Sequence, residues 1–283
     1  MTPEITFIIP TIYNFQGLAR CVETIWRFHE PETFRIFVID NSGKGLASQA
    51  IKEGKAHLII ESYRNLGFSK SLNTGIKLAE TPFICICNDD VEFVHKDWWP
   101  NIKEVFSRKD CEKVLGVAPS SIKGFPKSPE MDLLLYKKEY SQEDWDYLMS
   151  PKNKMAKILG LGEKHNSQWL FDGTMFFCVC FKKETFKIVG LMDEGFWPGG
   201  GGDDYDFCRR ICQKKFRIVQ TCNSFVQHHW RTTVGNIEVS IEEIKKYRHW
   251  ESFDEKWNKP GEKGANIYGE KGIANAPTIM VEI

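Results

Sequence analysis

The first 90 residues alternate short apolar runs with amphipathic stretches. The apolar runs, which are typical of buried β-strands, cover residues 5–9, 35–39, 57–61 and 83–87. Between the first two runs, apolar side chains recur at helical spacing over residues 18–26. This alternation predicts parallel βαβ units joined by right-handed crossovers, in which ligands bind beyond the carboxyl ends of the strands.

Polar groups gather directly after three of these runs. Residues 10–14, 40–43 and 88–90 each follow a predicted strand and are rich in polar side chains. Because the carboxyl ends of neighbouring parallel strands lie at one edge of a sheet, we expect these segments to form one shared site.

The third of these segments holds Asn88, Asp89 and Asp90. Like charges about 4 Å apart repel by roughly 4 kcal/mol at an effective dielectric constant of about 20. A hard cation relieves this repulsion, and oxygen ligands suit Mg²⁺ or Mn²⁺. Acids also commonly end strands and begin turns, which is the simpler interpretation of an isolated pair.

The second half of the chain is less regular. Apolar stretches at residues 114–118, 174–181 and 217–222 predict further strands. Residues 121–168 show weak periodicity, and we interpret them as an insertion. The polar tail beyond residue 235 is expected to cover the surface without forming a domain.

Four consecutive glycines, residues 199–202, precede Asp203 and Asp204 at a predicted helix start. Glycines allow a close approach of the backbone to a ligand, and the segment resembles a loop that closes over a site. In a crevice that excludes water, Asp204 is our candidate general base for a hydroxyl nucleophile. Asp203 is expected to cap the helix or to position the acceptor.

Adjacent histidines, His228 and His229, lie beyond the last predicted strand. One imidazole could complete a cation site or contact a phosphate, whereas adjacent histidines on a loop are also common as polar surface. The loop at residues 64–68, ahead of a predicted helix, could present backbone N–H groups to phosphates. An ordinary strand-to-helix loop is the alternative.

Composition narrows the class of protein. Basic and acidic residues both number 38, so no overall basic field marks a nucleic-acid or membrane-surface binder. The nine cysteines show no Cys-x-x-Cys spacing, which argues against a disulfide framework or a structural zinc site. No segment approaches the roughly 18 apolar residues of a membrane span. We therefore expect a cytoplasmic protein that could also be peripheral at a membrane.

Several of these motifs, in this order, resemble the GT-A family 2 glycosyltransferases. The motifs that carry the resemblance are Ile8-Ile9-Pro10-Thr11 with Asn14, Val38-Ile39-Asp40-Asn41-Ser42, Arg64-Asn65-Leu66-Gly67-Phe68 through Asn73-Thr74-Gly75, Asn88-Asp89-Asp90, Gly190-Leu191-Met192-Asp193-Glu194, Gly201 to Phe207 with Arg209-Arg210, and Phe253 to Trp257. The resemblance covers roughly residues 5–258, without the insertion.

The resemblance implies an α/β GT-A (Rossmann-like) fold with a mostly parallel central sheet, flanking helices and an acceptor-side insertion. It implies a catalytic domain over residues 1–235, with a nucleotide-sugar-binding half at 1–119 and an acceptor-binding half at 169–235. The insertion then spans residues 120–168. A C-terminal helix and surface tail occupy residues 236–283.

The resemblance also implies a metal-dependent hexosyltransferase that uses a nucleotide-diphosphate sugar, with UDP as the expected nucleotide. Nucleotide-binding positions would be Pro10, Thr11, Tyr13, Asp40, Arg64, Gly67, Asn73, Asn88 and Asp89. Asp90, with His228 or His229, would hold Mn²⁺ or Mg²⁺. Acceptor-binding positions would be Asp203, Trp197 and Gly202.

In the implied reaction, Asp204 accepts the proton of an acceptor hydroxyl, and a single displacement inverts the anomeric carbon. The acceptor could be a glycan, a lipid-linked or protein acceptor, or a nucleic acid. Two alternatives stay open from the residues. One is a GT-A-like nucleotidyltransferase, which would need a basic Gly-rich loop that residues 10–17 do not offer. The other is a non-catalytic sugar-nucleotide or glycan-binding protein.

Overall fold

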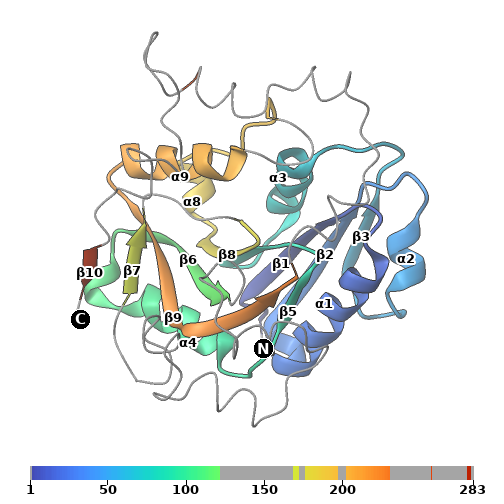
Figure 1. The fold of residues 1–283 in the computed structure, drawn as a ribbon, viewed down its shortest axis with the longest axis horizontal. Coiled ribbons are helices and arrows are strands. Elements are labelled where there is room, and N and C mark those ends of the chain that lie inside the picture. Colours follow the sequence, from blue (N-terminus) through green and yellow to red (C-terminus); the bar gives the residue numbers. More distant parts are fainter. Residues whose placement is uncertain are drawn as a thin grey trace, which may run out of the picture.

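A single mixed sheet organises the described part of the chain. The computed structural model describes residues 2–121, 168–171, 176–196, 202–229, 256 and 279–281. Within these residues the strand order is β10-β7-β9-β6-β8-β4-β1-β2-β3, and β5 pairs with β9 (Figure 1). The strands are β1 (Ile5–Thr11), β2 (Phe34–Asp40), β3 (Leu58–Glu61), β4 (Phe83–Cys87), β5 (Val91–Phe93), β6 (Val114–Ser121), β7 (Gln168–Phe171), β8 (Cys178–Lys182), β9 (Arg217–His228) and β10 (Ile279–Val281).

Helices flank this sheet, as the sequence predicts for an α/β fold. Those described are α1 (Phe15–Phe28), α2 (Leu46–Ala50), α3 (Phe68–Leu78), α4 (Trp98–Ser107), α8 (Thr185–Ile188) and α9 (Asp203–Gln213), with 3₁₀ turns η1 (Pro31–Thr33) and η2 (Lys109–Cys111). Helices α3 and α9 lie over one face of the sheet, and α1 and α4 lie over the other (Figure 1).

The strands expected in the first 90 residues are confirmed. Strand β1 pairs in parallel with β2 and with β4, and β2 pairs in parallel with β3. The register sets Thr11 beside Asp40, so the ends of β1 and β2 are level. This alignment brings the polar segments that follow the two strands to the same edge of the sheet.

The other half of the sheet contains the antiparallel pairings. Strand β8 runs antiparallel between β4 and β6, and β9 pairs in parallel with β6 and antiparallel with β5 and β7. Two predicted boundaries are wrong. Strand β8 begins only at Cys178, and β9 continues to His228, six residues beyond the predicted end at residue 222.

Most of the predicted insertion lies outside the described residues. Of residues 120–168, the structure describes the end of β6 and the first residue of β7. The tail contributes an edge strand that the sequence analysis did not predict, since β10 pairs antiparallel with β7.

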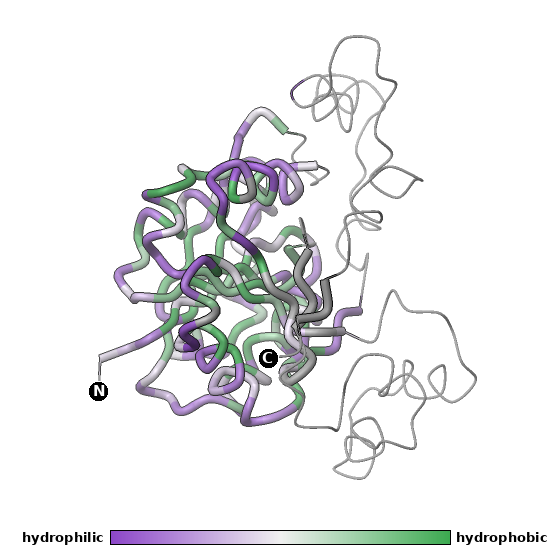
Figure 2. The backbone as a smooth tube through the Cα atoms, turned by 90° about the vertical axis from the view of Figure 1, so that its left-hand side faces the viewer, coloured by the Kyte–Doolittle hydropathy of each residue, from purple (hydrophilic) through white to green (hydrophobic). Residues whose placement is uncertain are grey.

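Alternating side chains of the strands fill a core on each face of the sheet. Phe7 and Ile9 pack with α1 and α4, whereas Ile8 packs with α3 and α9. Figure 2 shows the hydrophobic segments gathered in the middle of the described part, with hydrophilic segments around its outside. No helix of the described residues is long and apolar enough to cross a membrane.

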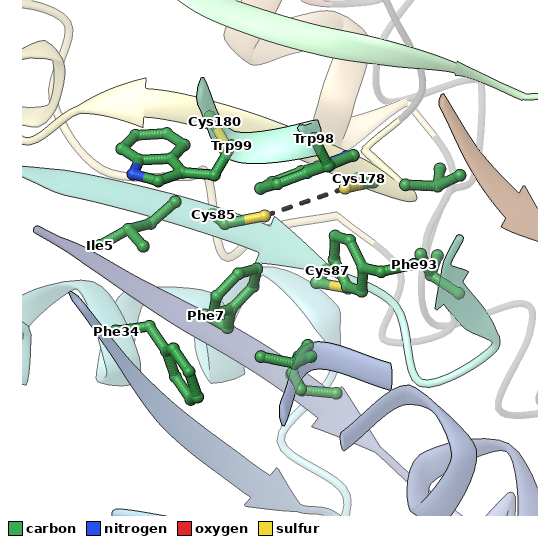
Figure 3. Packing of buried hydrophobic residues seen from close by; sticks show 14 of the residues in the cluster. Ile5, Phe7, Phe34, Cys85, Cys87, Phe93, Trp98, Trp99, Cys178 and Cys180 are labelled. Atoms are coloured by element: carbon green, nitrogen blue, oxygen red, sulfur yellow. Dashed lines mark hydrogen bonds between the residues drawn. The ribbon is translucent and has the colours of Figure 1, made fainter. Parts of the chain in front are cut away.

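Buried cysteines line the core beside Phe7, Phe93 and Trp98 (Figure 3). The Sγ atoms of Cys85 and Cys178 are 3.9 Å apart, without a disulfide. Burial raises the pKa of the Cys85 thiol well above its ordinary value, which keeps it protonated. The cysteines described therefore act as small core residues, as expected from the sequence.

Candidate active site at the carboxyl ends of the strands

Backbone hydrogen bonds join the loops that leave the parallel strands. The N–H of Asn41 donates to the carbonyl of Thr11 at 2.9 Å, and the N–H of Ser62 donates to the carbonyl of Asp40 at 2.8 Å. The ends of β1, β2 and β3 are therefore fixed relative to one another. This rigid edge carries the predicted nucleotide-binding residues.

Asp40 anchors the turn between β2 and α2. Its carboxylate accepts hydrogen bonds from the N–H groups of Ser42 at 2.7 Å and Ala47 at 2.8 Å, and the residue is 1% exposed. Since a carboxylate has about four acceptor sites, these bonds leave capacity for a ligand. Recognition of a base by Asp40 stays a prediction.

Asn41 is a residue whose role the sequence analysis missed. Its Nδ2 donates to the Ser71 hydroxyl at 2.9 Å, and its Oδ1 accepts from the N–H of Leu66 at 3.1 Å. These bonds position the loop before α3, where Gly67 has a φ of 82°. Residues with a side chain rarely adopt a positive φ, so glycine is the residue that fits this backbone conformation without strain. Asn41 directly follows a strand end, which was the available signal.

The rim of this edge carries an exposed pair, Tyr63 and Arg64. Tyr63 is 84% exposed, and the Arg64 guanidinium lies 5.5 Å from the centre of its ring. Tyr13, in the loop after β1, has a φ of 105°. The Lys44 Nζ atom lies 5.7 Å from the centre of the Tyr13 ring. The predicted binding residues Tyr13 and Arg64 are thus both on loops that leave the carboxyl ends of strands.

Asp89 is held by the end of β1. Its carboxylate accepts a hydrogen bond from the Thr11 hydroxyl at 2.7 Å and another from Asn14 Nδ2 at 3.1 Å. Asn14 also caps α1 by accepting from the N–H of Gly17 at 3.2 Å. Asp89 and Thr11, both predicted to bind nucleotide, therefore join β1, α1 and β4 in a buried cluster.

Asp90 contacts the opposite neighbour, the end of β9. The His228 Nε2 atom lies 3.1 Å from Asp90 Oδ1, and the N–H of His229 donates to the Asp90 carbonyl at 2.9 Å. The His228 ring stacks on Phe177 with centroids 4.6 Å apart and planes 11° apart. Asp90 and His228 are 4% and 7% exposed. His228 lies at the end of strand β9, which corrects the expectation that it follows the strand.

The donor atoms of this pair suit Mn²⁺ or Mg²⁺. Carboxylate oxygen and imidazole nitrogen both bind Mn²⁺, and adjacent ligands of an octahedral ion with bonds of about 2.1 Å lie about 3 Å apart. The described residues contain no group of three His, Cys, Asp or Glu side chains placed to hold an ion. Ions of this kind commonly take one or two protein ligands, with phosphates and water completing the shell. Asp90 and His228 therefore fit such a partial site.

Helix α9 brings a second pair of acids to the site. Asp203, which is 2% exposed, accepts a hydrogen bond from the Ser69 hydroxyl of α3 at 2.9 Å. Asp204 Oδ1 accepts from the N–H of Tyr205 at 2.9 Å. Burial and the charge of Asp203 raise the pKa of Asp204 to about 8, against weaker stabilisation by backbone N–H groups that include Phe176. A pKa near neutrality suits a general base.

Gly202 introduces this helix with a φ of 88°, and its carbonyl accepts from the N–H of Asp206 at 2.8 Å. Trp197 and the first three of the four glycines lie outside the described residues. The predicted contribution of Gly202 and Trp197 to acceptor binding stays a prediction.

Asn73 has a structural role that the sequence did not indicate, and its contribution to nucleotide binding stays a prediction. Its Nδ2 donates to the Met192 carbonyl at 2.9 Å and to Glu194 Oε1 at 2.8 Å. Its Oδ1 accepts from the N–H of Met192 at 2.9 Å. Because both amide hydrogens are used and the residue is 2% exposed, Asn73 connects α3 to the segment before α9.

Lys256 joins the C-terminal part of the chain to this segment. Its Nζ lies 2.7 Å from Asp193 Oδ2 and 2.7 Å from Asp206 Oδ1. Arg210 Nε also binds the Asp206 carboxylate at 2.9 Å. The two cations stabilise a fully buried acid in the first turn of α9.

The fold and the position of the acids define a class of protein. A parallel β3-β2-β1-β4 half, an antiparallel continuation through β8 and acids at the strand ends are the architecture of a GT-A glycosyltransferase. The chain belongs to glycosyl transferase family 2, whose family model matches residues 6–182.

Two solved structures show the same fold at low sequence identity. A mannosyltransferase from Pyrobaculum calidifontis in complex with GDP-Man and Mn²⁺ is 15% identical, with a TM-score of 0.55, over 83% of this chain and 60% of that one. GalNAc-T7 with UDP, GalNAc and Mn²⁺ is 16% identical, with a TM-score of 0.56, over 80% of this chain and 44% of that one. No curated protein sequence matches the chain.

Proposed function

We propose that this chain is a metal-dependent, inverting glycosyltransferase that moves a sugar from a nucleotide-diphosphate donor to a hydroxyl acceptor. The observation that supports this function most strongly is a short connection, through residues 176 and 177, between Asp204, the proposed base, and Asp90, the proposed ion ligand. The backbone N–H of Phe176 is one of the groups that lower the pKa of Asp204, and the ring of the next residue, Phe177, stacks on the His228 that contacts Asp90. This connection supports a base at Asp204 and a cation site at Asp90 that act on one substrate.

On the donor side, Asp40, Thr11 and Tyr13 would form the nucleotide pocket with the loop that ends at Gly67. We favour a UDP-sugar and retain a GDP-sugar as the second donor. Both are supported by the fold relatives, since one is a complex with GDP-Man and the other a complex with UDP. Pro10, Arg64 and Asn88 are the remaining candidate contacts.

Asp90 and His228 would hold the divalent ion, Mn²⁺ or Mg²⁺. Such an ion, when bound, neutralises the charge that develops on the leaving diphosphate. Both fold relatives are Mn²⁺ complexes, which supports this assignment. The buried setting of Asp90 strengthens the interaction, because charges attract more strongly where water is excluded.

Asp204 would act as the general base. The acceptor oxygen forms a bond to the anomeric carbon while the bond from that carbon to the diphosphate oxygen breaks. The acceptor's hydroxyl proton passes to Asp204, and the electron pair of the broken bond stays on the diphosphate. Attack from the face opposite the leaving group inverts the anomeric centre, as in single-displacement glycoside hydrolysis.

The acceptor-binding half would comprise residues 169–235, with Asp203, Gly202 and Trp197 near the acceptor. Candidate acceptors are a glycan, a lipid-linked glycan, a protein or a nucleic acid. We propose a cytoplasmic location, which the absence of a membrane-spanning helix among the described residues allows. Residues 120–168 flank this half, and insertions of this kind commonly set specificity.

A donor panel tests the function. UDP- and GDP-linked hexoses are incubated with the protein and Mn²⁺, and release of free nucleotide is measured with and without a chelator. We expect metal-dependent hydrolysis of one donor class, and Asp90→Asn should remove it. Binding of a sugar nucleotide without any turnover, with water or with acceptor mixtures, would contradict the enzyme and favour a non-catalytic binding protein.

A further inference from the structure

Two consecutive histidines at the end of β9 contact different acids. His228 Nε2 lies 3.1 Å from Asp90 Oδ1, and His229 Nε2 lies 2.9 Å from Glu92 Oε1. Glu92 belongs to β5, two residues after Asp90. The sequence left open which histidine contacts the ion, and these distances distinguish the two.

The Glu92 carboxylate also forms an ion pair with a side chain of helix α1. Arg20 Nε, on α1, lies 2.9 Å from the same Glu92 oxygen, Oε1. Glu92 is 8% exposed, whereas the Arg20 side chain is 47% exposed. The carboxylate is thus fixed from α1 and from β9 together, with the flexible arginine at the surface.

Two contacts tie the end of β9 to the segment that carries Asp90. The N–H of His229 donates to the Asp90 carbonyl, and the register of β5 with β9 sets Val91 opposite His228. The contact between the His229 and Glu92 side chains is a second link between the same two segments. Displacement of the end of β9, and of His228 with it, away from Asp90 would have to break both links.

We propose that Glu92, with His229 and Arg20, is a positioning group that holds Asp90 and His228 in the geometry needed to bind the divalent ion. The inference rests on the metal site in the proposed function. Neither Glu92 nor His229 needs to touch the ion. Groups that orient metal ligands in this way typically change metal affinity by about 10- to 100-fold when they are removed.

Three variants distinguish the effect of the contacts of Glu92 from the effect of its charge. Glu92→Ala removes both contacts of the carboxylate. Glu92→Gln removes the charge and keeps an oxygen that can accept from His229 and Arg20. Arg20→Met removes the exposed anchor only. The matched control is Glu4→Gln, because Glu4 has a comparable ion pair with Lys103 at 2.9 Å, but it lies before the amino end of β1, opposite the site.

The experiment measures Mn²⁺ binding to the purified protein, in the presence of UDP and separately of GDP, from the electron paramagnetic resonance signal of free Mn²⁺. We expect Glu92→Ala to weaken Mn²⁺ affinity about 10- to 100-fold. Glu92→Gln and Arg20→Met should each lose less, and Glu4→Gln should bind as the unchanged protein does. Circular dichroism checks that each variant is folded.

The outcomes separate the two proposals. No Mn²⁺ binding by the unchanged protein overturns the metal site and this inference with it. Normal binding by the unchanged protein and equal binding by all three Glu92 and Arg20 variants overturns this inference alone. If Glu92→Ala does not fold, the double variant Arg20→Met, Glu92→Gln replaces it, with an expected loss of about tenfold.

Discussion

The ring of Phe177 stacks on the imidazole of His228 with centroids 4.6 Å apart, and the Phe177 carbonyl accepts a hydrogen bond from the N–H of Asn88 at 2.8 Å. The backbone N–H of the preceding residue, Phe176, is one of the groups that lower the pKa of the Asp204 carboxyl, against the larger effect of burial. The short segment before β8 therefore contacts both the acid of α9 and the acid-bearing end of β4. The proposed base, Asp204, and the proposed ion ligands, Asp90 and His228, are thus connected through two residues, as expected if they act on a single bound substrate.

This relationship predicts separate effects for two substitutions. Asp204→Asn should lower transfer by about 10²- to 10⁴-fold, the usual contribution of a general base. Donor affinity should stay near that of the unchanged protein, because the amide is isosteric with the carboxylate and the proposed base acts on the acceptor hydroxyl. Asp90→Asn should weaken both donor affinity and transfer. Calorimetric donor binding and a transfer assay measure the two effects, and equal loss of donor affinity in both variants contradicts the assignment.

The pH profile of transfer tests the environment of Asp204. Burial and the neighbouring Asp203 raise the pKa of Asp204 to about 8, so this carboxyl is largely protonated at lower pH. A base must be ionised to act, and transfer should therefore rise with pH toward about pH 8. In Asp203→Asn one of the two causes is lost, so the rising limb should move to lower pH. A limb that stays in place would show that Asp203 does not influence the base.

The same pKa predicts an effect on stability. A carboxyl whose folded pKa is raised from 3.8 to about 8 keeps a proton that the unfolded chain releases. The free energy of unfolding should then decrease as pH rises between these values. Asp204→Asn removes this cost, so the variant should be more stable than the unchanged protein at pH 8 and similar to it near pH 4. Thermal unfolding at both pH values measures the difference, with Glu80→Gln as the exposed-acid control.

Apolar pattern was sufficient to predict the parallel half of the sheet. Strands β1, β2, β3 and β4 lie within two residues of their predicted bounds, because each is a short and mostly apolar run. Strand β9 was predicted too short since the part beyond residue 222 carries Ser224 and Gln227, which are polar yet buried. Pairing with β5 and β6 extends this strand, and such pairing is not visible in a local pattern.

For the site, too, residue types could be predicted from the sequence, whereas contacts between distant side chains could not. Acids at strand ends were visible as residue types, and so was the pair that begins α9. The sequence could not show that the Asn73 side chain bonds to Met192, because a buried amide in a helix can find its partners on several neighbouring segments. Nor could it distinguish His228 from His229, since only the side-chain contacts of the folded chain assign His228 to Asp90 and His229 to Glu92.

The close packing of α3 against β1 at Gly75 can be tested by adding a methyl group there. A Cβ atom added there would lie 2.5 Å from Cγ2 of Ile8, a distance that requires the helix or the strand to shift. Gly75→Ala should destabilise the protein by about 1–3 kcal/mol, which is typical of overpacking. It should also weaken transfer, because α3 carries Ser69 and Asn73. Thr74→Ala, at the exposed neighbouring position, is the control in chemical denaturation. An unchanged midpoint for Gly75→Ala would contradict the close packing.

Substitution of Lys256 measures how much its two ion pairs contribute to the free energy of unfolding. Lys256→Met removes a cation from two acids, Asp193 and the fully buried Asp206, and leaves Arg210 as the remaining cationic partner we describe for Asp206. We expect a loss of about 2 kcal/mol in the free energy of unfolding, the scale of hydrogen bonds to charged groups. Lys256→Arg keeps the charge and should recover part of this loss. Removing the acid partner tests the link directly: in an Asp193→Asn background, Lys256→Met should cost less than it does alone. Additive losses in the double variant would show that Lys256 and Asp193 do not interact in solution.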